Sequence, residues 1–300
     1  MYFWTLWLVV LSIWYCSMSS NTGSFASRCE DSFERVRAFL ELPETTELVV
    51  RTQRRVAESM GIFDEMLDQL DEVSLSYNGG KDCLVMLVIY MALLYKKLSR
   101  EELDSIDRLN TVLVNYEHYF PELTAFIESS SQTYGLNLEQ YNDTMKHGFQ
   151  RYHFPELTAF IESSSQTYGL NLEQYNDTMK HGFQRYLEQH GNVKAIVVGT
   201  RRTDPYGSSL APFQPTDSGW PSFMRVHPVL NWQYDEIWCF LRLANVPYCS
   251  LYDMGYTSLG GVDTTVKNPW LKTDGGEYRP AYELANGDER ERDGRLQPSQ

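Results

Sequence analysis

Short apolar runs alternate with amphipathic stretches along most of the chain, and this pattern predicts alternating strands and helices. Residues 73–76 alternate apolar and small polar side chains and predict a short buried strand. Residues 84–95 are almost continuously apolar, which is typical of a helix buried on most sides. Further buried strands are predicted at 111–116 and 195–198, and residues 223–230 predict a fourth strand that enters a turn. Strands joined by crossover helices predict an α/β fold with an open, mostly parallel sheet and helices on both faces.

Helical spacing is clearest in the stretches that flank these strands. Residues 30–70 predict two helices, of which the second covers about 45–70. Apolar residues at i, i+3, i+4 and i+7 predict an amphipathic helix over 233–244. Residues 208–222 are rich in Ser, Pro and Gly and predict a loop.

A turn with two glycines, Asn78-Gly-Gly-Lys-Asp82, connects the first strand to the apolar helix. A strand, a glycine turn and a helix can surround an anion with free backbone N–H groups and the positive end of the helix. The missing Cβ atoms of Gly79 and Gly80 let the backbone approach phosphate. Lys81 adds a mobile positive charge, and Asp82 can cap the turn or hold Mg²⁺. The spacing is not that of a Walker A loop, and an ordinary capped turn is the alternative interpretation.

Composition and net charge limit the classes of partner that the protein is expected to bind. The 300 residues suit one large domain or two small ones, and the net charge of −14 argues against nucleic acid or an anionic membrane as partner. The five cysteines are odd in number and show no Cys-x-x-Cys spacing. This pattern disfavours a disulfide framework or a zinc site and fits a reducing compartment, so we expect a cytoplasmic protein.

Residues 2–17 are strongly apolar and could be a signal peptide or a membrane anchor. Against this interpretation, the first basic residue is Arg28, and the run is short for a membrane span. Met18 follows immediately and precedes a polar stretch. We expect translation from Met18, so that residues 1–17 lie outside the fold and 18–300 form one domain. A membrane partner is expected only if residues 1–17 are translated.

A perfect tandem duplication interrupts the second half of the predicted sheet. Residues 154–186 repeat residues 120–152 without a change, at an offset of 34. Solenoid repeats share a pattern and not every surface residue, so the identity indicates a very recent duplication or an assembly error. We expect the core to use the helix 121–132 from the first copy and the helix 176–189 from the second, with the material between them extruded. The second copy could equally be used whole.

The string Ser76-Tyr-Asn-Gly-Gly-Lys-Asp-Cys83 resembles the PP-loop of the ATP pyrophosphatases, which break ATP between its α and β phosphates. Its form is similar to the branch that contains eukaryotic FAD synthase and the phosphoadenylylsulfate reductases. Four more strings resemble FAD synthase: Gly199-Thr-Arg-Arg-Thr-Asp-Pro-Tyr-Gly207, Arg225-Val-His-Pro-Val-Leu-Asn-Trp232, Tyr248-Cys-Ser-Leu-Tyr-Asp-Met-Gly-Tyr-Thr-Ser-Leu-Gly260 and Glu291-Arg-Asp-Gly-Arg295.

This resemblance implies an adenine nucleotide alpha hydrolase-like, Rossmann-like fold and the transfer of AMP from ATP to FMN, which gives FAD and pyrophosphate. It implies that a loop of seven residues binds ATP: Ser76, Tyr77, Asn78, Gly79, Gly80, Lys81 and Asp82. The resemblance also implies that Asn78 and Asp82 position phosphates and Mg²⁺, with Asp82 as the candidate magnesium ligand. Arg292 and Arg295 resemble the arginines that close over the phosphates, although a solvated charge run is the alternative.

For the flavin, the resemblance implies a segment 201–300 that closes over flavin and phosphates. Asp204 is expected to accept a hydrogen bond from the N–H edge of the flavin ring, although on sequence alone it could cap a turn. Arg201 and Arg202 are candidates for the FMN phosphate, and Pro205 and Tyr206 complete the same flavin-binding string.

Two other functions stay open at this point. A sulfonucleotide reductase is the first alternative, but the reductases use a cysteine near the C-terminus and none follows Cys249 here. A flavin or nucleotide binder disabled by the duplication is the second. We expect a monomer whose partners are the small molecules ATP and FMN, with Mg²⁺ and without nucleic acid.

Overall fold

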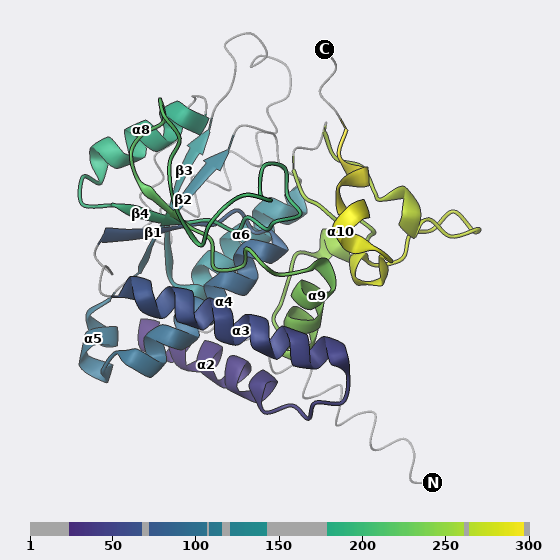
Figure 1. The fold of residues 1–300 in the computed structure, drawn as a ribbon, viewed down its shortest axis with the longest axis horizontal. Helices are drawn as coiled ribbons and strands as arrows, with labels where there is room; N and C mark the ends of the chain where they lie inside the picture. Colours follow the sequence, from purple (N-terminus) through teal and green to yellow (C-terminus); the bar gives the residue numbers. More distant parts are fainter. Residues whose placement is uncertain are drawn as a thin grey trace.

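Six strands form one sheet in the order β3-β2-β1-β4-β6-β5 (Figure 1). The computed structural model describes residues 24–67, 72–106, 108–115, 121–142, 179–260 and 264–296. All neighbouring strands pair in parallel except β5, which is antiparallel to β6. The prediction of an open, mostly parallel sheet is confirmed. The strands are β1 (Val73–Ser76), β2 (Leu109–Asn115), β3 (Leu136–Asn142), β4 (Ala195–Val197), β5 (Phe213–Pro215) and β6 (Met224–Val226).

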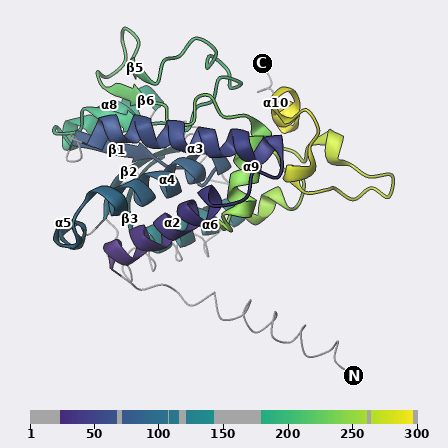
Figure 2. The same ribbon diagram turned by 60° about the horizontal axis from the view of Figure 1, so that its bottom comes forward.

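Helices cover both faces of the sheet and bury two separate apolar clusters. The larger cluster lies under α2 (Phe25–Leu40), α3 (Glu47–Met66), α4 (Lys81–Lys97), α6 (Pro121–Tyr134) and α9 (Tyr234–Leu243). The smaller cluster lies under α8 (Met179–Gln189), on the opposite face. Figures 1 and 2 show α8 on one side of the sheet and α2, α4 and α6 layered on the other.

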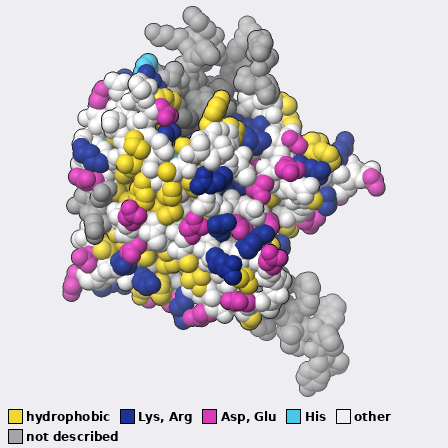
Figure 3. All heavy atoms as spheres, in the orientation of Figure 1, with side chains coloured by type: hydrophobic (Ala, Val, Ile, Leu, Met, Phe, Trp, Pro, Cys, Tyr) yellow, Lys and Arg dark blue, Asp and Glu magenta, His cyan; other side chains and the backbone are white. Residues whose placement is uncertain are grey.

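The central helix α4 is buried from Cys83 to Leu94, which explains its unbroken apolar run. The amphipathic helix α3 begins at the N-cap Thr46, whose side chain accepts a hydrogen bond from the Val49 N–H group. The charged side chains on the visible face of the molecule are interspersed in sign (Figure 3). Arg51 and Arg55 of α3 pair with acidic residues of α9. Two further helices are short: α5 (Arg100–Ser105) follows α4, and α10 (Gly287–Arg290) lies near the C-terminus.

Two strands of the sheet, β3 and β5, are not among the four that the sequence predicted. Residues 208–222 were expected to be a loop, but β5 lies within them at the edge of the sheet. A three-residue edge strand that ends in Pro215 is too short to show alternation, and proline removes one ladder donor. The strand predicted within 223–230 is β6, which is three residues long and enters a turn at His227 and Pro228, as expected.

Residues 1–23, which include the apolar leader, lie outside the described residues. Translation from Met18 therefore stays a prediction. Within the part of the chain that the structure describes, no helix combines the length and apolarity needed to cross a bilayer.

Both copies of the duplication contribute to the core. The first copy supplies α6, whose Leu123 and Ile127 are buried in the larger cluster, and also β3. The second copy supplies α8, whose Tyr186 is buried in the smaller cluster. The helices therefore come from different copies, as expected, and β3 is a further element from the first copy. The expectation that residues 133–175 are extruded is wrong for residues 136–142, because they form β3 in the sheet, and the part beyond residue 142 lies outside the described residues.

We predict that deletion of one copy leaves the fold unchanged. Because the copies are identical, removing residues 120–153 or 153–186 gives the same shortened sequence. That sequence keeps α6 and β3, and residues 145–152 repeat the first eight residues of α8. Only Asp143 and Thr144 would then connect β3 to the helix, within the usual range of about 2–6 residues for such connections.

The shortened protein should therefore unfold at the same temperature as the full chain or higher, and it should keep its activity. Thermal unfolding monitored by circular dichroism and the assay described below test this expectation. Loss of both stability and activity would show that the second copy is needed as a whole.

Candidate active site

A cavity of about 710 Å³ lies at the edge of the sheet where β1, β4 and β6 end. In open parallel sheets this edge is where ligands bind. Its lining combines residues that follow these strands with loop residues, one α8 side chain and a C-terminal arginine: Ser76, Asn78, Phe183, Val198, Thr200, Pro205, Tyr206, Ser209, Leu210, Gln214, Thr216, Asp217, Trp220, Phe223, Arg225, His227, Leu259, Gly260 and Arg295. Five of the predicted site residues, Ser76, Asn78, Pro205, Tyr206 and Arg295, therefore share one cavity.

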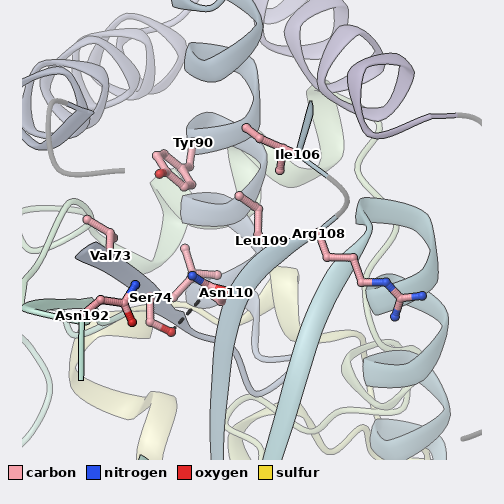
Figure 4. A pocket seen from close by; sticks show the side chains of 9 residues that line it. Val73, Ser74, Tyr90, Ile106, Arg108, Leu109, Asn110 and Asn192 are labelled. Atoms are coloured by element: carbon pink, nitrogen blue, oxygen red, sulfur yellow. Dashed lines mark hydrogen bonds between the residues drawn. The ribbon is translucent and has the colours of Figure 1, made fainter. Parts of the chain in front are cut away.

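A second cavity of about 250 Å³ lies at the opposite edge of the sheet (Figure 4). Ser74 and Asn110 line it near the starts of β1 and β2, and the Ser74 hydroxyl donates to the Asn110 carbonyl oxygen at 3.2 Å. Asn192 lines it from the turn before β4. Its described lining includes none of the predicted site residues, so the chemistry expected from the sequence belongs to the larger cavity.

The glycine turn is shaped by contacts with the rest of the protein. Gly79 has a φ of +70°, and it is buried so closely that a Cβ atom there would lie 2.4 Å from Cγ1 of Ile127. The Gly80 N–H group donates to Oδ1 of Asn78, and the Lys81 N–H group donates to the Tyr252 hydroxyl, both at 3.0 Å. The expectation that these amides are open to an anion is therefore wrong for Gly80 and Lys81, because protein groups already accept from them.

Tyr77 lies in the core and not in the cavity. Its side chain is fully buried, and its hydroxyl hydrogen-bonds to the Ser130 hydroxyl of α6. Burial raises the pKa of Tyr77 well above its ordinary value. The predicted ATP contact is therefore not available to this side chain, which instead packs the loop against α6.

Lys81 is held in place and is not the mobile charge expected from the sequence. Its side chain is only 2% exposed, and its Nζ atom lies 3.0 Å from Oδ2 of Asp82 and also contacts Oε1 of Glu291. Burial lowers the pKa of Lys81, but the two neighbouring carboxylates outweigh burial and hold this pKa above its ordinary value. The ammonium group is thus charged and shared between two carboxylates.

Arg201 completes a ring of four charges with Lys81, Asp82 and Glu291, which we call the charge ring. Its Nε atom lies 2.8 Å from Oδ1 of Asp82, without hydrogen-bond alignment, and its Nη2 atom contacts Oε2 of Glu291. Its Nη1 atom lies 3.4 Å from Oδ1 of Asp288. The guanidinium is thus buried among carboxylates, and its predicted contact with the FMN phosphate stays a prediction.

The pKa values inside the ring follow from these contacts. Burial raises the pKa of Asp82, but Arg201 and Lys81 outweigh burial and lower this pKa below its ordinary value. Burial likewise lowers the pKa of Arg201, while Asp82 and Glu291 hold it above its ordinary value. These shifts favour the charged forms of Lys81, Asp82 and Arg201.

Asp204 lies between Arg201 of the charge ring and Arg292 near the C-terminus. Its Oδ2 atom accepts a hydrogen bond from the Arg201 N–H group at 2.9 Å, and its Oδ1 atom lies 3.9 Å from Nη1 of Arg292. Burial and the charge of Asp82 raise the pKa of Asp204. Asp204 is not among the residues that line the cavity. The predicted contact of Asp204 with the flavin ring stays a prediction.

Of the remaining predicted residues, Arg202 braces a loop, whereas Tyr206 and Arg295 line the cavity. Arg202 donates through Nε to Oδ1 of Asn231 at 2.7 Å and through Nη1 to the carbonyl oxygens of Ser208 and Leu210, so it braces the loop, and its contact with the FMN phosphate stays a prediction. Tyr206 has a φ of +64° and is 96% exposed at the cavity. The guanidinium of Arg295 lies so close to Gly260 that a Cβ atom there would overlap it.

Comparison with known proteins agrees with this geometry. The family model of the phosphoadenosine phosphosulfate reductase domain matches residues 72–267. The probable FAD synthase of Schizosaccharomyces pombe is 33% identical over 260 residues, which cover 86% of this chain and 85% of that protein. The chain belongs to the FAD synthase family. The flavin adenine dinucleotide synthase of Saccharomyces cerevisiae is 30% identical over 260 residues, 82% of this chain and 76% of its own length.

Solved structures of FAD synthase family members share the fold. Candida glabrata FMN adenylyltransferase in complex with FMN and the ATP analogue AMPCPP matches with a TM-score of 0.75 and 28% identity, over 92% of this chain and 98% of that one. Yeast FAD synthetase in complex with FAD matches with a TM-score of 0.74 and 27% identity, over 91% of this chain and 100% of that one. By contrast, an adenosine 5'-phosphosulfate reductase of Bacillus subtilis matches only 15% of this chain. The reductase alternative is therefore supported less well.

Three residues at the site of this FAD synthase family member received no role from the sequence. Tyr252 caps the Lys81 amide, Glu291 closes the charge ring, and Asp288 accepts from the Tyr234 N–H group at 2.9 Å. Tyr252 and Glu291 lie inside the strings that resemble FAD synthase, which was the one available signal. Sequence spacing does not say which charges meet, so their contacts could not be assigned.

Gly79 gives a prediction for the turn of the FAD synthase site. Gly79→Ala is expected to destabilise the protein by about 2–4 kcal/mol, because alanine would adopt a left-handed φ and press on Ile127. Gly61→Ala is the matched control: Gly61 lies in α3 with nothing within 4 Å of a new Cβ atom, so this change should stabilise by about 0.5–1 kcal/mol. Urea unfolding measures both, and equal effects would contradict the packing at Gly79.

Proposed function

We propose that this member of the FAD synthase family transfers AMP from ATP to FMN, which forms FAD and releases pyrophosphate. The observation that carries the proposal is the meeting of the PP-loop, Asp204 and Arg292 beside the large cavity. The solved relatives support it, since Candida glabrata FMN adenylyltransferase was captured with FMN and AMPCPP and also with FAD and inorganic pyrophosphate.

In the proposed reaction, a phosphate oxygen of FMN forms a bond to the α-phosphorus of ATP while the bond to the β-phosphate oxygen breaks. The electron pair of that bond leaves with pyrophosphate. FMN phosphate is already ionised near neutral pH, so the protein needs no strong base. Catalysis then consists of in-line placement of the two substrates and neutralisation of developing charge.

The C-terminal arginines fit this demand for positive charge. Arg292 lies at 3.9 Å from Asp204, and Arg295 lines the cavity with Asn78. Guanidinium groups offer forked donors that match phosphate oxygens. Arg295 lines the cavity whereas Lys81 and Arg201 do not, so the C-terminal arginines are the better candidates for direct phosphate contacts.

The large cavity fits a flat ring. Its volume of about 710 Å³ lies within the usual range of about 300–1,000 Å³ for small-molecule sites. Phe183 of α8 and Phe223 form part of its wall, with ring centroids 5.4 Å apart. Tyr206 is exposed at the same cavity and can cover a bound ring. We assign Pro205 and Tyr206 to the flavin, as the sequence resemblance implied.

Magnesium is part of the proposal. Mg²⁺ in such sites takes one or two carboxylates together with substrate phosphates, and when bound it neutralises phosphate charge. Asp82 fits this role poorly, because each of its oxygens already contacts a cation. Asp204 fits better, because among the described residues its Oδ1 atom pairs with Arg292 alone, at 3.9 Å, and because burial and the charge of Asp82 raise its pKa. No group of three or more potential metal-binding side chains occurs among the described residues, so phosphates would have to complete the shell.

We also propose that the protein works in the cytoplasm as a monomer, with ATP and FMN as its partners. Cys29, Cys83, Cys239 and Cys249 are buried and unpaired in the described part of the chain, which supports a reducing compartment.

The deciding experiment incubates the purified full chain with FMN, ATP and Mg²⁺. We expect the fluorescence of FMN to fall as FAD forms, with one pyrophosphate released per FAD. Binding of both substrates without pyrophosphate release would support the disabled binder instead. Reduction of an adenylyl sulfate to sulfite would support the reductase.

A further inference from the structure

Glu291 is a buried carboxylate that bridges the two cations of the charge ring. Its Oε1 atom contacts Nζ of Lys81, and its Oε2 atom contacts Nη2 of Arg201. Asp82 bridges the same two cations from the other side, through Oδ2 and Oδ1. Each cation is therefore fixed between two carboxylates, and each carboxylate uses both oxygens.

The backbone around Glu291 is held by contacts that do not involve its carboxylate. The Thr257 hydroxyl donates to the Glu291 carbonyl oxygen at 2.6 Å, and the Asn268 amide donates to the Arg290 carbonyl oxygen at 2.8 Å. The Val266 N–H group donates to the Gly294 carbonyl oxygen at 2.8 Å. These bonds fix the turn Glu291–Gly294 without the charge, so the carboxylate acts chiefly on the cations.

The two cations stand at the points where the site is assembled. Lys81 is the first residue of α4, and its backbone forms part of the PP-loop turn. The backbone of Arg201 holds the carboxylate of Asp204 at 2.9 Å. A change in the position of either cation therefore moves a group that the proposed reaction uses.

We propose that Glu291 is a positioning residue of the ATP site. It fixes the positions of the Lys81 and Arg201 side chains and thereby holds the PP-loop and Asp204 in place relative to each other. This inference rests on the proposed function. Glu291 does not line the cavity, so it acts through the two cations and not by contact with substrate. A role in fold stability alone would lower the amount of active protein and leave the substrate affinities of the folded molecules unchanged.

The test compares Glu291→Gln with Glu289→Gln, a control that removes the same charge from an exposed residue in the same segment. E291Q keeps the size of the side chain but places an uncharged amide between two cations. We expect E291Q to raise the KM for ATP by about tenfold, with the KM for FMN within about twofold of the control. E291D, which keeps the charge on a shorter side chain, should give an intermediate KM for ATP.

Equal KM values for ATP in E291Q and E289Q would overturn the proposal, as would a loss of activity that only follows a lower melting temperature. If E291Q does not fold, E291D decides by the same comparison. Titration calorimetry with ATP alone keeps the test separate from the proposed function. A wild-type protein that forms no FAD would refute that function, while weaker ATP binding by E291Q than by E289Q would still support the positioning role.

Discussion

Arg201→Met is expected to destabilise the protein by about 3–5 kcal/mol, which is among the largest single effects that a buried charge can have. Arg201 is fully buried and lies against Asp82, Glu291 and Asp288. Methionine fills a similar volume but leaves two buried carboxylates to share the single ammonium of Lys81. The protein loses stability because negative charge is left uncompensated where water has little access, and not because a cavity forms.

Arg202→Met is the matched control, because it removes the same group from the next position along the chain. Arg202 is exposed and braces a loop through hydrogen bonds, so its loss should cost about 1 kcal/mol. Guanidinium chloride unfolding at pH 7 measures the difference between the two variants. Equal free energies of unfolding would mean that the charge ring contributes no more to stability than a surface loop contact.

Asp204→Asn is expected to lower the rate of FAD formation by about a hundredfold or more. Asparagine keeps the size of the side chain and can still accept from the Arg201 N–H group, so the fold should persist. It removes the negative charge that faces Arg292 and that we assign to magnesium. Asp274→Asn, on an exposed loop residue, is the control and should leave the rate unchanged.

The pH dependence of the rate provides a second readout for Asp204. Burial and the charge of Asp82 raise the pKa of Asp204, so this carboxyl group takes up its proton at a higher pH than an ordinary aspartate. If the reaction needs the ionised form, the wild-type rate should fall as the pH drops through that raised pKa. The D204N variant should lack this fall. The same acidic limb in both proteins would assign the titration to another group.

Much of the fold could be predicted because periodicity reports which side of an element is buried. The apolar run of α4 and the alternating β1 are buried as their patterns indicated. The six-residue stretch predicted at 111–116 matches β2 closely, and the amphipathic helix predicted at 233–244 is α9. The edge strand β5 was missed because three residues with a terminal proline carry no alternation.

The duplication shows a different limit of sequence reasoning. Two identical segments have identical propensities, so no local pattern can say which copy enters the sheet. The structure takes α6 and β3 from the copy next to β2, and α8 from the copy next to β4. Chain connectivity explains this choice, since each element is used where its tether to the neighbouring strand is shortest.

For the site, the sequence by itself determined the order of strand, glycine turn and helix, the strings shared with the FAD synthase family, and the set of residues available for phosphate chemistry. Only the tertiary structure decided which of those charges face a ligand and which neutralise one another. Lys81 and Arg201 meet Glu291 across 210 and 90 positions of sequence, respectively. The physical reason is that a periodic pattern encodes the buried face of one element, whereas an ion pair depends on the distance between side chains of several elements, which exists only once those elements have packed.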